Sequence, residues 1–158
     1  MYIIHPLKPI YDSNSKVLIL GTMPSVKSRE ANFYYANKNN RFWPIMESIF
    51  NTKLETNEDK EKFLINNNIA IWDVIKSCDI TGSSDSSIKN IKINDIDKVI
   101  KNSNIKAIFC TGKKAYETLN KNYKTNSPII YLSSPSSANA KKKIDDLKEE
   151  YEIILNYL

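Results

Sequence analysis

A short apolar run near the N-terminus constrains the fold of this chain more than any other feature. Residues 17–20 (Val-Leu-Ile-Leu) form a continuous hydrophobic stretch whose length is typical of a strand buried on both faces. Gly21 ends the run and Pro24 prevents its continuation, so residues 21–25 are predicted to form a tight turn at the carboxyl end of the strand. A long polar and aromatic stretch follows before the next apolar periodicity. A loop of that length in a small domain is usually a binding or catalytic loop.

The rest of the chain alternates between strand-like and helix-like patterns. Further apolar strands are predicted at residues 69–72, 106–110 and 128–132. Helical spacing is found at residues 41–51, 58–67, 93–101 and 113–122, and in a long helix after residues 134–137 with apolar positions 144, 147, 151, 154, 155 and 158. We interpret residues 1–15 as an extended arm and residues 76–92 as a second long loop. This alternation predicts an α/β fold, a three-layer α/β/α sandwich around a central, mainly parallel four-stranded sheet, in one domain over residues 1–158.

The loops after the four predicted strands should meet at one edge of the sheet. In parallel α/β sheets, ligands bind beyond the carboxyl ends of the strands. The turn at residues 21–25, the loop at 76–92, Gly112 and the serine-rich stretch at 133–137 each follow a different strand. The sequence therefore predicts a binding site built by four loops at this edge.

Bulk composition narrows the class of partner without identifying it. The formal net charge is +5 and the pI is about 9.0, which suits a polyanionic partner but leaves DNA, RNA and acidic proteins equally open. The only two cysteines, Cys78 and Cys110, lack metal-ligand spacing, as is typical of a reduced cytoplasmic protein. No apolar run approaches the length of a membrane span, so we expect no membrane association.

Lysines recur where two of the predicted helices begin at the ligand edge. Lys113 and Lys114 are predicted in the first turn of one helix, and residues 141–143, all lysine, in the first turn of the last helix. A cation there opposes the helix dipole at a cost of about 0.3–1 kcal/mol each when exposed, whereas a bound phosphate would be favoured. Lys27 and Arg29 add charge to the same edge. The alternative is that these side chains are simply solvated.

Two separated motifs carry a resemblance to a known family. Gly-Thr-Met-Pro-Ser at residues 21–25, followed by Tyr-Tyr-Ala-Asn-Lys-Asn-Asn-Arg-Phe-Trp at 34–43, resembles motif 1 of the uracil-DNA glycosylase superfamily. Leu-Ser-Ser-Pro-Ser-Ser-Ala-Asn at residues 132–139 resembles the second motif of the same family. The hypoxanthine (deoxyinosine) DNA glycosylases are the most similar branch, and the mismatch-specific uracil-DNA glycosylases come next. The resemblance runs through nearly the whole chain in order.

The resemblance implies a base-excision repair enzyme that hydrolyses the N-glycosidic bond of a deaminated base, hypoxanthine by preference, flipped out of DNA. It implies double-stranded DNA as partner, with single-stranded DNA possible, a monomer, and no cofactor or metal. No lysine aligns with a Schiff-base nucleophile, so we expect a monofunctional glycosylase without lyase activity. Two alternatives remain: specificity for uracil or mismatches, and a non-catalytic domain that binds nucleic acid or a nucleotide at the same edge.

Base binding is assigned by the resemblance to the first motif. Tyr35 falls where related enzymes place an aromatic ring under the base, although Tyr34 could exchange roles with it and either ring could belong to the core. Gly21, Thr22, Met23 and Pro24 form the turn whose backbone N–H groups would stabilise the departing base. Many relatives carry Asp or Asn where this chain has Met23, and a thioether cannot orient water.

Asn40 is the predicted catalytic residue. Relatives of the hypoxanthine type place their essential amide at the Asn before Arg-Phe-Trp, which is Asn40 here. Because an amide is no effective base, Asn40 would orient water or the base. Capping of the helix that starts near Arg41 is the alternative role, and Asn37 and Asn39 are close enough to confuse the assignment.

The second motif and the remaining polar residues complete the predicted site. Residues 134–137 (Ser134, Pro135, Ser136 and Ser137) would contact DNA phosphates together with Lys113 and Lys141, although a serine-rich helix cap is the alternative. The chain departs from the family pattern at Asn37-Lys38, Ser25 and Ser133, which affects substrate preference. Asp73, Ser83, Asp85 and Ser86 either line the pocket or tie their loop together, and we favour the second. His5, the only histidine, is expected to be a surface or packed residue with no group to orient it.

Overall fold

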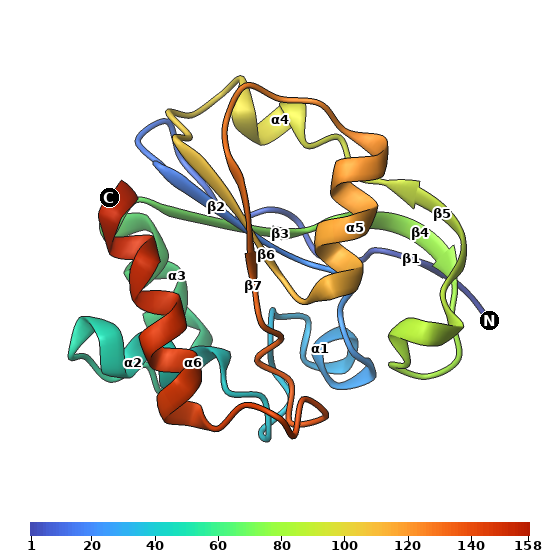
Figure 1. Cartoon of the computed structure of the whole chain (residues 1–158), viewed down its shortest axis with the longest axis horizontal. Coiled ribbons are helices and arrows are strands. Elements are labelled where there is room, and N and C mark those ends of the chain that lie inside the picture. Colours follow the sequence, from blue (N-terminus) through green and yellow to red (C-terminus); the bar gives the residue numbers. More distant parts are fainter.

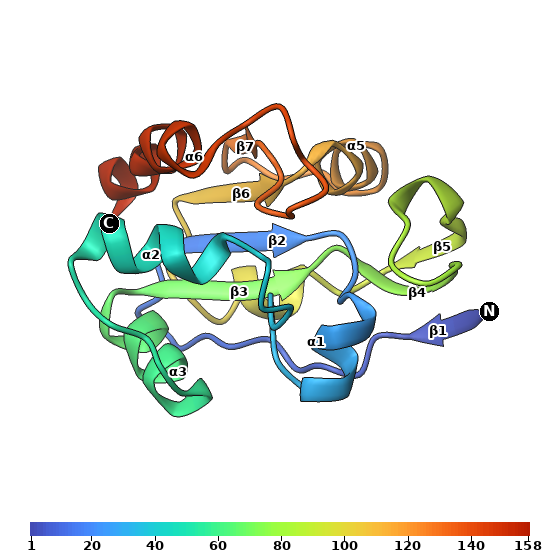
Figure 2. The same ribbon diagram turned by 90° about the horizontal axis from the view of Figure 1, so that it is seen from below.

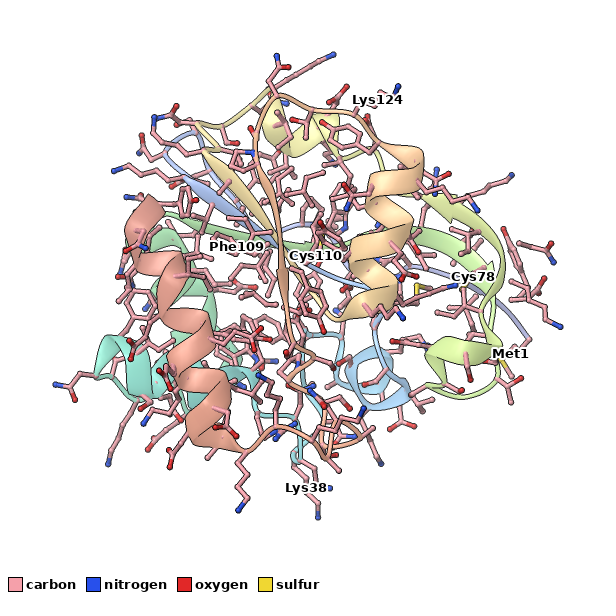
Figure 3. The ribbon with its side chains drawn as sticks, viewed as in Figure 1. Met1, Lys38, Cys78, Phe109, Cys110 and Lys124 are labelled. Carbon is pink, nitrogen blue, oxygen red and sulfur yellow. The ribbon has the colours of Figure 1, made fainter.

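Four parallel strands form the centre of the protein, in a computed structural model that describes all 158 residues. The strand order is β3-β2-β6-β7, with β2 at Val17–Gly21, β3 at Ile69–Asp73, β6 at Ala107–Thr111 and β7 at Ile129–Leu132. Every residue of β2, β3 and β6 is buried, as continuous apolar runs in a parallel sheet require. All four predicted strands are confirmed. Phe109 and Cys110 of β6 lie near the middle of the molecule (Figure 3).

Helices cover both faces of this sheet and make the predicted three-layer α/β/α sandwich (Figures 1 and 2). One face carries α2 (Phe42–Phe50) and α6 (Ile144–Tyr151), which continues as the 3₁₀ helix η2 (Glu152–Tyr157); α3 (Asn57–Asn66) packs beside β3. The other face carries α4 (Asp97–Ile100) and α5 (Lys113–Asn122). From β2 the chain moves to β3 on one side, and from β6 to β7 on the other. Right-handed crossovers in opposite directions place the connecting helices on opposite faces.

A second, smaller sheet lies where the sequence predicted only an arm and a loop. β1 (Tyr2–Ile4), β4 (Ile75–Asp79) and β5 (Lys89–Ile93) pair antiparallel in the order β1-β4-β5. The prediction of one loop over residues 76–92 is therefore wrong. β5 alternates exposed and half-buried residues and is rich in lysine, so its single apolar face gave a weak signal. Only the short 3₁₀ helix η1 (Asp85–Ser87) and its flanks remain as a loop.

One helix was not predicted, and two others begin later than predicted. The long first loop contains α1 (Val26–Ala31), which Ser25 caps by accepting a hydrogen bond from the backbone N–H of Ser28. The helix predicted from residue 93 begins at Asp97, and Asn94 instead donates to the carbonyls of Asp73 and Ile75. The last helix begins at Ile144, so the three lysines at residues 141–143 precede its first turn.

The core is built as the helical spacing predicts. The inward stripe of α2 consists of buried Phe42, Trp43, Ile45 and Met46, with Ile49 and Phe50 half-buried at its end. None of the helices combines the length and apolarity needed to cross a membrane.

Candidate active site

A cleft of about 540 Å³ opens at the carboxyl ends of β2, β3 and β6. This edge is where the connections leave the sheet in opposite directions, the position at which open α/β sheets bind ligands. Its lining residues come from strand ends, loops and short helices far apart in the sequence: Gly21, Thr22, Met23, Pro24, Ser25, Ser28, Tyr34, Tyr35, Asn37, Asn40, Asp73, Ser83, Ser84, Asp85, Ser86, Thr111, Ser134, Pro135, Ser136, Ser137, Ala138 and Asn139.

The two sequence motifs therefore meet in one cleft. All the predicted base-binding residues, the predicted catalytic Asn40 and the serine-proline stretch at 134–137 line it. Lys113 and Lys141, predicted to bind DNA, are exposed and do not line it. The lining residues include Asp73 and Asp85 but no lysine or arginine, so cations that could neutralise a phosphate are available only around the cleft.

Tyr35 presents a supported aromatic face to the cleft. Its ring stacks on Phe42 with centroids 4.1 Å apart and planes 12° from parallel. Its hydroxyl and that of Thr111 share a hydrogen bond of 2.7 Å. The backbone of Tyr35 is left-handed, with a φ of 51°, a conformation that is uncommon for a large residue and is often found at functional sites.

Tyr34 has a different position from its neighbour. It is only 3% exposed, and its hydroxyl donates to the carbonyl of Lys8 over 2.6 Å. Burial, and then the charge of Asp73, raises the pKa of both tyrosines, which keeps both hydroxyls protonated. Of the two rings, Tyr35 is the one held flat against a partner inside the cleft.

Asn40 caps α2 and keeps a free amide. Its side-chain oxygen accepts a hydrogen bond from the backbone N–H of Phe42 over 2.9 Å. The N-cap position of α2 is Arg41, whose own side chain makes no capping bond, so the Asn40 side chain performs the predicted capping role. The Nδ2 group of Asn40 donates to no group in the chain, and the residue lines the cleft. Capping fixes the oxygen and leaves the NH₂ group for a ligand or water.

Two residues of α1, Ser28 and Arg29, support the first motif. Ser28 in α1 is 2% exposed, and its hydroxyl accepts from the backbone N–H of Ala36, which fixes the strained turn at Tyr35. Arg29 donates to the carbonyl of Pro24 over 2.8 Å. Arg29, expected at the phosphate-binding edge, thus supports the turn itself. The backbone N–H groups of Thr22 and Met23 donate to no group in the chain.

Arg41 joins the two motifs. Its guanidinium donates to the carbonyls of Pro135, Ser136 and Asn139 at 3.2, 2.6 and 3.0 Å, and also to that of Lys142. Its backbone N–H also donates to Pro135. The fork of donors in arginine suits several carbonyls at once, so Arg41 fixes the loop of the second motif to the start of α2. Nothing in the local pattern indicated these long-range bonds.

Asp73 is the main site residue that sequence analysis underrated. It ends β3, is 4% exposed and lines the cleft. The Nε2 atom of His5 lies 2.7 Å from its Oδ2 atom, and the Nδ1 atom of His5 contacts the backbone of Leu7. The expectation that nothing orients His5 is therefore wrong, because the N-terminal arm lies across the end of β3. An acidic residue directly after a buried strand is the signal that could have found Asp73.

The loop around η1 closes another side of the cleft. Ser83, Ser84, Asp85 and Ser86 line it, and the Ser83 hydroxyl accepts from the backbone N–H of Val26. The prediction that we favoured, that these residues serve only to tie their loop together, is therefore wrong: they line the cleft, and Ser83 also joins the loop to α1. Burial raises the pKa of Asp85, Lys114 lowers it, and the charge of Asp73 raises it further.

Fold and cleft together describe an α/β protein with a cleft, lined by a supported aromatic ring, where its parallel strands end. Comparison with known proteins gives the family. Residues 9–158 match the model of the uracil DNA glycosylase superfamily, so the chain belongs to that superfamily. The enzyme is a DNA glycosylase, a hydrolase of N-glycosidic bonds, as its curated relatives are.

Those relatives match over most of their length. A hypoxanthine DNA glycosylase from Methanosarcina acetivorans is 31% identical over 154 residues, which cover 94% of this chain and 95% of the relative. A second from Methanosarcina barkeri is 30% identical over 140 residues, covering 85% and 88%. The solution NMR structure of a candidate uracil DNA glycosylase from M. acetivorans superposes with a TM-score of 0.80 at 29% identity, covering 98% of this chain and 99% of that one. This agreement confirms the predicted fold class.

Proposed function

We propose that this DNA glycosylase releases hypoxanthine from deoxyinosine in DNA. The observation that carries the proposal is the pairing of a Phe42-supported Tyr35 ring with the free amide of Asn40 in one cleft. A flipped nucleobase needs such a stacking face, and bond hydrolysis needs a positioned water. The names of the two Methanosarcina relatives support hypoxanthine as the base.

In this proposal, each step of the reaction is carried out by particular residues of the cleft. The base stacks on Tyr35, and the bond between C1′ of the sugar and N9 of the base breaks with its electron pair going to the base. The free N–H groups of Thr22 and Met23 stabilise the negative charge that develops on the base. A water oriented by the Asn40 amide adds to C1′, and its proton is transferred to the departing base.

DNA is held around the cleft. Ser134, Ser136 and Ser137, on the loop fixed by Arg41, contact phosphates through hydroxyl and backbone groups, and Lys113 and Lys141 add charge outside the cleft. We propose that the substrate is double-stranded DNA and that a monomer acts without a Schiff-base step. We place the enzyme in the cytoplasm, where free thiols such as those of Cys78 and Cys110 persist.

The test is base release from otherwise identical duplexes that contain hypoxanthine, uracil or xanthine, with the same single strands assayed in parallel. We expect hypoxanthine to be released with the highest kcat/KM. Faster release of uracil would replace this proposal with the uracil-specific alternative. Tight binding of all three duplexes without release of any base would favour a non-catalytic binding protein.

A further inference from the structure

We infer that Glu150 in α6 is a positioning residue for DNA binding, because its carboxylate joins the two ends of the loop between β7 and α6. This second-motif loop consists of residues 133–143 and carries the serines that we propose to contact phosphates. The inference therefore rests on the proposed function. It starts from a glutamate that lies outside the cleft and holds the backbone of the loop.

Residues of α6 fix the point where the loop leaves the sheet. Ser133 is the first residue after β7 and is 7% exposed. Its backbone N–H donates to Oε2 of Glu150, and its carbonyl accepts from the hydroxyl of Tyr151, a fully buried side chain, over 2.7 Å. Two consecutive residues of α6 thus hold both backbone groups of Ser133.

The same carboxylate reaches the far end of the loop. Oε1 of Glu150 is buried without a hydrogen bond inside the chain, and Nζ of Lys142 lies 3.6 Å from it. The carbonyl of Lys142 accepts from the guanidinium of Arg41. Lys142 is therefore held through its backbone by α2 and through its side chain by Glu150, which links it to Ser133.

The part of the loop that faces DNA lies between these two anchors. The serines at residues 134, 136 and 137 line the cleft, whereas Ser133, Lys142 and Glu150 line a separate hollow of about 470 Å³. Ordering a mobile loop costs conformational entropy, so a loop that is already fixed binds its partner more tightly. Glu150 acts on DNA through this loop and not on the bond that breaks.

This role predicts an effect opposite in sign to that of charge alone. Glu149 lines the same hollow as Glu150, but it is exposed and its side chain makes no hydrogen bond or ion pair. Because DNA is a polyanion, removal of either negative charge should strengthen binding by electrostatics. Weaker binding after removal of Glu150 alone would therefore identify its hydrogen bond to the loop.

The test compares Glu150→Leu with Glu149→Leu on a hypoxanthine duplex whose lesion nucleotide carries a 2′-fluorine, which slows cleavage by disfavouring positive charge at C1′. In fluorescence anisotropy, Glu150→Leu should bind about 10-fold more weakly, as expected for loss of a hydrogen bond to a charged group. Glu149→Leu should bind as tightly as wild type or more tightly. Glu150→Gln keeps an oxygen that can accept from Ser133 and should stay within about 3-fold of wild type.

The rate of base release separates positioning of DNA from catalysis. Single-turnover release from the unmodified hypoxanthine duplex at saturating enzyme should stay near the wild-type rate in Glu150→Leu, while the enzyme concentration for half-maximal rate rises with the loss of affinity. A fall in the saturated rate with unchanged affinity would place Glu150 in catalysis and overturn the inference.

Ser133→Pro removes the donor instead of the acceptor, because proline has no backbone N–H. It should weaken binding about as much as Glu150→Leu, and the double variant should bind little more weakly than either single variant. Losses that multiply in the double variant would mean that the two residues act separately, against the inference. Melting temperatures identify variants that fail to fold, and if Glu150→Leu is one of them, Ser133→Pro decides the same question against Glu149→Leu.

Two results separate this inference from the proposed function. If wild-type enzyme releases no hypoxanthine but Glu150→Leu still weakens binding of the duplex, the proposed function fails and the role of Glu150 stands. If wild-type enzyme releases hypoxanthine and folded Glu150→Leu binds the duplex as tightly as Glu149→Leu, the role of Glu150 is overturned and the proposed function stands.

Discussion

Tyr35 has the most unusual conformation among the residues proposed to bind the base. A left-handed backbone costs a non-glycine residue about 1–3 kcal/mol, and here the hydrogen bond from Ala36 to Ser28 and the stack on Phe42 maintain it. The sequence could place Tyr35 in the binding loop but could not separate it from Tyr34. The two differ in backbone conformation and in tertiary contacts, since only Tyr35 has a positive φ and the hydroxyl of Tyr34 reaches Lys8 in the N-terminal arm.

Removing the Tyr35 ring should slow base release far more than removing its hydroxyl. Stacking on an aromatic ring contributes about 1–3 kcal/mol per base, so Tyr35→Leu should lower kcat/KM for hypoxanthine by roughly 5- to 150-fold. Tyr35→Phe keeps the stack on Phe42 and should stay within a few-fold of wild type. Tyr34→Phe is the matched control, because it loses a hydrogen bond to Lys8 outside the stack and should lower the melting temperature while sparing release. Equal losses in Tyr35→Leu and Tyr34→Phe would refute the assignment.

Gly21 should tolerate no side chain. The added methyl group of Gly21→Ala would meet Oδ1 of Asp73 at 2.4 Å and the Tyr35 hydroxyl at 3.1 Å. Such overpacking costs about 1–3 kcal/mol, and it displaces two residues of the cleft. We expect lower stability in denaturant unfolding together with loss of base release. A variant with wild-type stability and wild-type release would show that the strand ends are not packed as described.

The elements with a continuous apolar run or clear helical spacing were the ones that the sequence predicted. β2, β3, β6 and β7 are apolar runs, and α5 was predicted with the bounds it has. β1, β4 and β5 were missed because none of them is a continuous apolar run: β1 has three residues, β4 mixes buried apolar and polar residues, and β5 is lysine-rich and largely exposed. α1 was missed because its six residues lie in a polar loop and contain almost no apolar periodicity.

The loop of the second motif depends on α2 through Arg41. Its guanidinium donates to carbonyls spread from residue 135 to residue 142. Arg41→Lys keeps the charge but cannot reach several carbonyls at once, so we expect weaker binding of lesion-containing duplex for both Arg41→Lys and Arg41→Ala. Binding measured by fluorescence anisotropy should fall about 10-fold or more, the loss expected from several partly buried hydrogen bonds. If Arg41→Lys bound DNA as tightly as wild type, charge rather than the shape of the loop would explain binding.

Across the whole molecule, the sequence predicted where the cleft lies but not the long-range hydrogen bonds between the residues around it. Strand ends and motifs placed Gly21, Tyr35, Asn40 and Ser134 at one edge, and the structure brings them together in one cleft. The pairing of His5 with Asp73 joins positions 68 residues apart, and no local pattern encodes such a contact. The lysines at residues 141–143 were assigned to a helix turn that they precede, because the N-cap residue, Lys143, is not of a type that marks a helix start in a sequence.

Binding to DNA should depend on charge near the cleft. Replacing both Lys113 and Lys141 with alanine should reduce the slope of log affinity against log salt by about 2, one for each lost phosphate contact. Lys124→Ala is the control, since Lys124 follows α5 at the end of the molecule opposite Lys38 (Figure 3). An unchanged slope in the double variant, or an equal change in Lys124→Ala, would refute phosphate contact at these two residues.

The central claim is that Asn40 drives release of hypoxanthine, and single-turnover release from a hypoxanthine duplex tests it most directly. Asn40→Asp keeps the oxygen that caps α2 but loses the free NH₂ group, Asn40→Ala loses both, and Asn39→Ala, at an exposed neighbour outside the cleft, is the control. We predict that release falls by at least about 100-fold in both Asn40 variants while the proteins stay folded, which corresponds to roughly 2.7 kcal/mol of lost transition-state stabilisation. Asn39→Ala should remain near wild type. Release near the wild-type rate in a folded Asn40→Ala variant would contradict the account.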